Sequence, residues 1–210
     1  MKSLTLTASI AVAAITASSY AGIFSMSVFE NSSNTSVIGL NIDILVTQML
    51  PGTVDFKISN NSVAPLTGAG INNIYFESTS FTIAALSSPS IQVEPSGVDF
   101  SVSGSPGAPP AGNNIGFSQS VAEFTRTGGG GNRISAGEFL TVRFMLANPY
   151  TLANVIASLG NGGFRIGTHT LSVGPNANSV STVNNIPAPG ALGLAALGGL
   201  VAIRRRREIA

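Results

Sequence analysis

The chain of 210 residues contains no cysteine and no tryptophan, and its only histidine is His169. Without cysteine it forms no disulfide framework, offers no thiolate to a metal ion and has no thiol nucleophile. Only 9% of its residues are charged, so a folded body must draw its stability mainly from buried apolar side chains. The lack of tryptophan also argues against a sugar-binding platform of stacked aromatic rings.

The sequence offers little for catalysis. A Ser–His–acid triad would have one available base, His169, and no Gly-x-Ser-x-Gly turn is present to hold its serine. The four glycines at Gly128–Gly131 are not followed by Lys-Ser or Lys-Thr, as a phosphate-binding loop requires, and we interpret them as a hairpin loop. We therefore expect a protein that is not an enzyme, has no cofactor and holds no metal ion.

Two pairs of acidic residues leave alternatives open. Asp43 and Asp55 could approach each other on neighbouring strands, and Glu94 and Asp99 flank a turn. Paired carboxylates held ~5–10 Å apart hydrolyse glycosides, and clustered acids in loops bind calcium. Because no calcium-binding loop pattern accompanies these residues, we interpret them as solvated acids.

The first 21 residues show the order of features that signal peptidase recognises. Lys2 supplies a positive charge, residues 4–17 are uncharged and mostly apolar, and small residues precede a cut between Ala21 and Gly22. We therefore predict a cleavable signal peptide at 1–21.

The C-terminal end is apolar and then strongly basic. The fourteen residues 190–203 are uncharged, and Arg204, Arg205, Arg206 and Arg207 follow directly. As a helix they would cover about 21 Å, less than the ~30 Å hydrocarbon core of a bilayer. Arginine stems can extend that span, and an arginine cluster stays on the cytoplasmic side. We predict an apolar C-terminal helix that anchors the body outside the inner membrane.

Residues 186–207 resemble the PEP-CTERM sorting signal, which is also described as the C-terminal region of ice-binding proteins. The resemblance rests on Pro187, Ala188, Pro189 and Gly190, on the apolar stretch and on the arginine run. The family motif is Pro-Glu-Pro, so Ala188 stands where the family has glutamate. The resemblance implies an exported protein of a Gram-negative bacterium. Its membrane-anchored precursor would be cut by an exosortase near the prolines and passed to the cell surface or the extracellular matrix.

Most of the positive charge belongs to these two signals. Lys2 and the four tail arginines account for five of the ten basic residues, and Glu208 accounts for one of the nine acidic residues. The segment 22–186 therefore keeps five basic and eight acidic residues, a net charge of about −3. Its basic residues are scattered, which argues against a nucleic-acid partner: Lys57, Arg126, Arg133, Arg143 and Arg165.

Short stretches that alternate apolar and polar residues, bounded by glycine, proline, asparagine and serine, run through the middle of the chain. The predicted strands are 23–29, 37–45, 54–58, 73–77, 81–86, 91–94, 98–102, 121–125, 139–146 and 164–173. One helix is predicted over 150–159, with Pro149 in its first turn and Gly160 as its C-terminal cap.

The pattern predicts an all-β fold: an antiparallel β-sandwich over 22–173, of which the jelly roll is one arrangement. A flexible stalk at 174–186 and the sorting tail at 187–207 would follow. The leading hypothesis is an exported, non-catalytic surface or matrix protein. The alternative is a secreted polysaccharide-binding module. Asn31, Asn34 and Asn60 begin acceptor patterns for glycosylation, which stays open.

Overall fold

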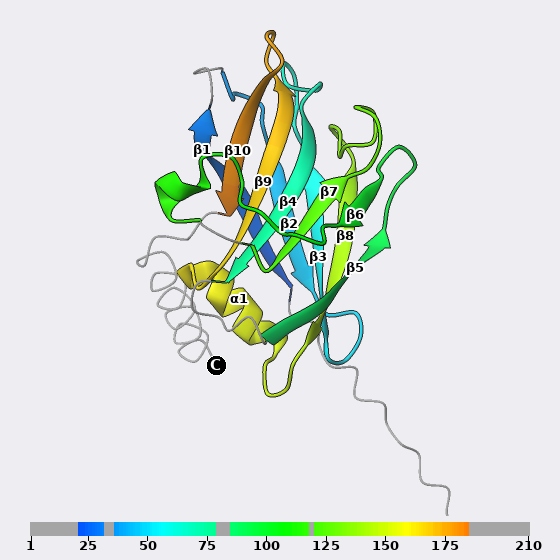
Figure 1. Ribbon diagram of the computed structural model, residues 1–210, viewed down its shortest axis with the longest axis vertical. Coiled ribbons are helices and arrows are strands. Elements are labelled where there is room, and N and C mark those ends of the chain that lie inside the picture. The colour runs from blue at the N-terminus through cyan, green and yellow to red at the C-terminus, as the bar shows by residue number, and fades with distance from the viewer. Residues whose placement is uncertain (1–20, 32–35, 79–84, 118–119, 185–210) are drawn as a thin grey trace, which may run out of the picture.

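The computed structural model describes residues 21–31, 36–78, 85–117 and 120–184. In these residues ten strands pair antiparallel in one sheet of order β5-β8-β3-β2-β1-β10-β9-β4-β7-β6 (Figure 1). The strands are β1 (Gly22–Asn31), β2 (Ile42–Thr47), β3 (Thr53–Asn60), β4 (Gly70–Ser78), β5 (Leu86–Val93), β6 (Phe100–Val102), β7 (Ala122–Arg126), β8 (Phe139–Leu146), β9 (Phe164–Val173) and β10 (Asn178–Asn184).

The sheet bends back on itself at β1. Residues 22–25 of β1 pair with β2, and residues 26–31 pair with β10. Strands β2, β3, β8 and β5 therefore form a back layer, and β10, β9, β4, β7 and β6 form a front layer (Figure 1). The end strands β5 and β6 lie near each other without pairing in the described residues, so the sheet is nearly closed.

Five phenylalanine rings join the two layers. Phe56 and Phe144 come from the back layer, and Phe76, Phe124 and Phe164 come from the front layer. The ring centroids of Phe76 lie 5.2 Å from Phe56 and 5.0 Å from Phe144. Tilted and edge-on rings at such distances add to the free energy already gained from burying them. This cluster lies at the centre of the hydrophobic core.

Helix α1 (Leu152–Asn161) packs at one end of the bent sheet (Figure 1). Its first turn is closed by a capping box between Thr151 and Asn154, and it ends at Gly162 in the left-handed conformation. The prediction of a helix here is confirmed, but both predicted ends were wrong. Pro149 lies in the preceding turn, and Gly160 lies inside the helix.

The predicted strand at 37–45 is correct only in its second part. Residues 38–39 form a turn, and β2 begins at Ile42. The predicted strand at 81–86 falls mostly on residues outside the described ranges. The glycine run at 128–131 is a turn, but it joins β7 to β8, which lie in different layers and do not pair. The hairpin interpretation of this run was therefore wrong.

The largest correction concerns the predicted stalk. Residues 178–184 form β10, which is hydrogen-bonded to β1 on one edge and to β9 on the other. Asn184 accepts a hydrogen bond from the backbone N–H of Ile166 at 2.7 Å and donates one to the carbonyl of Leu159 at 3.2 Å. The folded body therefore reaches at least Asn184, and its predicted boundary at 173 was too early.

The first described strand, β1, starts at Gly22, directly after the predicted signal-peptide cut, and Ala21 is exposed. The rest of the predicted signal, residues 1–20, and the predicted tail at 187–207 lie outside the described residues. Among the residues that are described, no helix combines the length and the apolar character that crossing a membrane requires.

The position of β10 can be tested by truncation. A chain that stops after residue 177 should lose cooperative unfolding in urea, because β1 and β9 would each lose a neighbouring strand and Asn184 would be removed. A chain that stops after residue 184 should unfold cooperatively, like the full chain. Circular dichroism followed through urea titration measures both. Cooperative unfolding of the shorter chain would contradict an integral β10.

Candidate functional site

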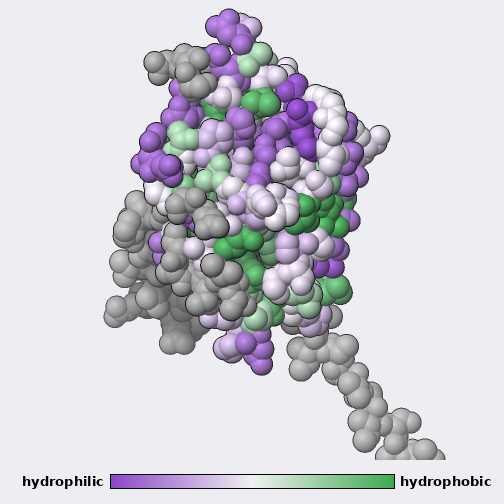
Figure 2. All heavy atoms as spheres, in the orientation of Figure 1, coloured by the Kyte–Doolittle hydropathy of each residue, from purple (hydrophilic) through white to green (hydrophobic). Residues whose placement is uncertain are grey.

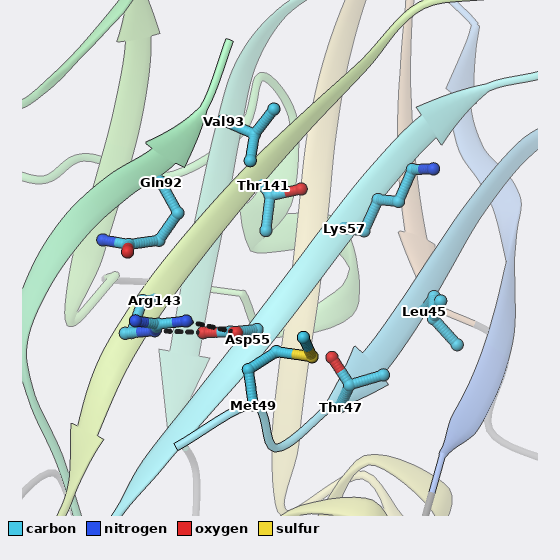
Figure 3. Close-up of a pocket in the computed structure, with 9 residues that line it drawn as sticks. All are labelled: Leu45, Thr47, Met49, Asp55, Lys57, Gln92, Val93, Thr141 and Arg143. Atoms are coloured by element: carbon cyan, nitrogen blue, oxygen red, sulfur yellow. Dashed lines mark hydrogen bonds and ion pairs between the residues drawn. The ribbon is translucent and has the colours of Figure 1, made fainter.

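A groove lies on the outer surface of the back layer (Figure 3). Its volume is about 430 Å³. Strands β2, β3, β8 and β5, together with the turn after β2, supply its lining, which mixes apolar, hydroxyl, amide and charged side chains. The lining residues are Leu45, Thr47, Met49, Asp55, Lys57, Gln92, Val93, Thr141 and Arg143.

Strand register explains why these side chains share one surface. Leu45, Lys57, Thr141 and Val93 are partners in one row across β2, β3, β8 and β5. A second row, two residues earlier in β3, contains Thr47, Asp55 and Arg143. Because alternate residues of a strand face opposite sides, the intervening residues, such as Phe56 and Val142, point into the core.

Asp55 and Arg143 form a two-pronged ion pair on the floor of the groove (Figure 3). Arginine Nε lies 2.5 Å from Oδ1 of Asp55, and Nη2 lies 2.7 Å from Oδ2. The side chains are 4% and 19% exposed, respectively. The hydrogen bonds to Asp55 raise the pKa of Arg143. This matched geometry offsets the cost of removing both charges from water.

The groove retains unused hydrogen-bond donors. Arginine has five N–H donors, of which two bond Asp55. The other three have no partner among the described residues. Lys57 Nζ lies 4.0 Å from the ring centroid of Phe139, a cation–π contact that holds the ammonium group without a counter-charge. Lys57 pairs with no carboxylate in the described part of the chain.

The structure does not bring Asp43 and Asp55 together, and the interpretation of Asp55 as a solvated acid was wrong, because its side chain is buried against Arg143. Asp43 accepts hydrogen bonds from Ser25 and Asn61, whereas Asp55 pairs with Arg143. They lie in separate rows of β2 and β3.

The acids at the turn after β5 also have separate partners. Glu94 accepts a hydrogen bond from the backbone N–H of Phe100 at 2.6 Å, and Asp99 lies 3.5 Å from the amide of Asn132. Over the described residues, no three histidine, cysteine, aspartate or glutamate side chains gather in a way that could hold a metal ion.

The outer surface of the front layer is crossed by the segment 103–117, which includes the short helix η2 (Gly112–Ile115) (Figure 1). Arg165 donates to the carbonyls of Ile115 and Gly116 at 2.8 Å and lies over the ring of Phe117. The same guanidinium pairs with Glu77. The crossing segment is thus fastened to the sheet.

Glu123 fastens the same segment at its other end. One carboxylate oxygen accepts the backbone N–H of Gly107 at 2.9 Å, and the other accepts from Asn73 and Thr125. Burial, and then the nearby Glu123 charge, raise the pKa of Tyr75. Figure 2 shows that hydrophilic side chains gather mainly in the upper half of this face.

His169 lies on this front surface, paired in register with Asn73 of β4 and Ser181 of β10. The hydroxyl of Ser181 is buried and has no hydrogen-bond partner among the residues that the structure describes. Although register brings a serine beside the histidine, no hydrogen bond joins them. Its half-buried position lowers the pKa of His169 from the ordinary value of 6.5, because burial disfavours the charged imidazolium.

Of the residues predicted to be processed or to anchor the chain, only Ala21 and Gly22 are described. The proline motif Pro187–Gly190 and the arginines Arg204–Arg207 lie outside the described ranges. The fold makes one of the three glycosylation patterns inaccessible. The side chain of Asn60 is buried and donates hydrogen bonds to the carbonyls of Ala69 and Ile134. No family model, curated protein or solved structure matches this chain.

Sequence reasoning did not identify the groove. Its lining comes from four strands, and the ion pair joins residues 88 positions apart. The available signal was the polar face of β3, where Asp55 and Lys57 alternate with buried residues. Without the order of strands, that face could not be matched to Arg143.

Replacing Arg143 by methionine should lower the free energy of unfolding by about 1–3 kcal/mol, because the Asp55 carboxylate would lose its partner. The double variant Asp55→Leu/Arg143→Met should recover most of that loss. Urea denaturation of both proteins tests this. A single variant as stable as the wild type would show that the pair is not needed.

His169 should give the protein a measurable pH dependence. Its pKa is lowered in the folded state, so the unfolded state binds the proton more readily once the pH falls below about 6.5. The contribution of His169 to the free energy of unfolding is therefore fully present above that pH and decreases below it. Between about pH 7.5 and about pH 5.5, the free energy of unfolding should fall more for the wild type than for His169→Gln. Equal slopes for the two proteins would contradict a buried neutral imidazole.

Proposed function

We propose that this chain is an exported, non-catalytic protein of a bacterial cell surface or extracellular matrix, sorted by its C-terminal segment. The observation that carries the proposal is the position of the predicted cuts. Signal peptidase would cut before Gly22, where β1 begins, and an exosortase-like protease would cut near 187–190, beyond the end of β10 at Asn184. Both cuts would leave every described strand intact.

The roles of the acidic side chains support a structural body. Asp55 and Glu77 are bound to arginines, Glu123 holds the crossing segment, and Glu94 and Glu138 accept backbone N–H groups at turns. Side chains with these contacts stabilise loops and strands, because removing one would leave its partner without a hydrogen bond. This use of carboxylates supports a non-catalytic role.

For the finer description of the fold, we favour a β-sandwich. The two layers pack face to face through the five phenylalanine rings, as the inner faces of a sandwich do. Some strands that follow one another in the chain are also neighbours in the sheet: β1, β2 and β3 form one such run, and β9 and β10 form a pair.

The groove favours a second candidate function, a polysaccharide-binding module. Hydroxyl, amide and guanidinium groups lie beside Leu45, Met49 and Val93 in one open groove (Figure 3). Sugar rings present hydroxyl groups at their edges and apolar C–H faces, so such a mixed lining suits them. This function is compatible with a surface or matrix location.

Intact mass spectrometry of the native protein, after separation of inner membrane, outer surface and medium, tests the sorting proposal. We expect a surface or medium species that begins at Gly22 and ends within 187–190. Replacing Arg204–Arg207 with glutamines should reduce this species, whereas Arg126→Gln should not. A chain that keeps its tail and is found only in the inner membrane would overturn processing, and a cytoplasmic chain that begins at Met1 would overturn export.

A further inference from the structure

We propose that the groove on the back layer binds an acidic polysaccharide, with Lys57 and Arg143 as the groups that contact its anionic sugars. This inference rests on the polysaccharide-binding function proposed above and names the class of ligand. It assigns a contact role to two residues that belong to separate strands, β3 and β8.

The hydrogen-bonding capacity left in the groove is dominated by donors. Three N–H donors of Arg143 and the ammonium group of Lys57 have no acceptor among the described residues. Both oxygens of the one lining carboxylate, Asp55, already accept from Arg143. A ligand rich in oxygen acceptors therefore fits this surface better than a ligand that mainly donates.

The net charge of the groove also favours an anionic ligand. The groove contains Lys57, Arg143 and Asp55, a net charge of +1, although the segment 22–186 as a whole carries about −3. Asp43, two residues before Leu45 on the same face of β2, lies outside the lining and accepts hydrogen bonds from Ser25 and Asn61. An anionic ligand is thus attracted to the groove and repelled by much of the remaining surface.

The apolar part of the lining favours a sugar ring over a small inorganic anion. Leu45 and Val93 occupy the two ends of the row that also contains Lys57 and Thr141, and Met49 borders the next row. A pyranose ring placed against these side chains would cover apolar surface while its carboxylate reaches Lys57. A small inorganic anion would use the charges but would leave the rest of the groove in contact with water.

The full-length protein should bind polygalacturonate more tightly than fully methyl-esterified polygalacturonate, which has the same backbone without the charge. Isothermal titration calorimetry measures both. Lys57→Met, which keeps the stem over Phe139, should weaken polygalacturonate binding about tenfold, a loss of about 1.4 kcal/mol. Arg126→Gln removes one positive charge from the front layer and should leave the affinity unchanged. Added salt should weaken binding to the wild type more than to Lys57→Met.

A third variant, Thr141→Trp, fills the groove whatever the charge of the ligand and should abolish binding, with its urea midpoint confirming that it folds. Equal affinity of the wild type for both polymers, or an unchanged affinity of Lys57→Met, would overturn the acidic ligand. If Thr141→Trp still abolished binding in that case, the polysaccharide-binding function would stand. Failure of the wild type to bind either polymer would overturn the proposed ligand class, while fractionation of the native protein would still decide its export.

Discussion

The packing of phenylalanine rings between the two layers is the interaction on which the rest of the structure depends. The chain has no disulfide to close its bent sheet, and the end strands β5 and β6 do not pair with each other. Phe76 contacts rings from both layers and is completely buried. Because the inner faces are held by these contacts, the outer faces are left for charged and polar side chains.

Those outer faces are used in two different ways. On the front layer, Arg165 and Glu123 hold a long crossing segment against the sheet, and their hydrogen bonds are directed to backbone groups of that segment. On the back layer, Asp55 and Arg143 pair with each other and leave donors directed to solvent or to a ligand. The same residue types therefore fasten a loop in one place and line an open groove in the other.

A strand with a regular alternation, such as β8, could be predicted to the residue because one of its faces is buried throughout. Strand β10 could not, since its inward side chains include the polar Thr182 and Asn184, which are satisfied by Thr168, Ile166 and Leu159. The groove depends on the order of β2, β3, β8 and β5, which arises from long-range pairing that local sequence does not encode.

The pairing of β10 with β1 has a consequence for how the protein is made. The first and last described strands are neighbours, so the sheet receives its final central strand only when residue 184 is free to pair. Long-range pairing of this kind is slow to form, because a long loop must close before any contact rewards it. During synthesis, the chain therefore lacks its complete sheet until its last strand is released, and folding of the sheet is completed only after that.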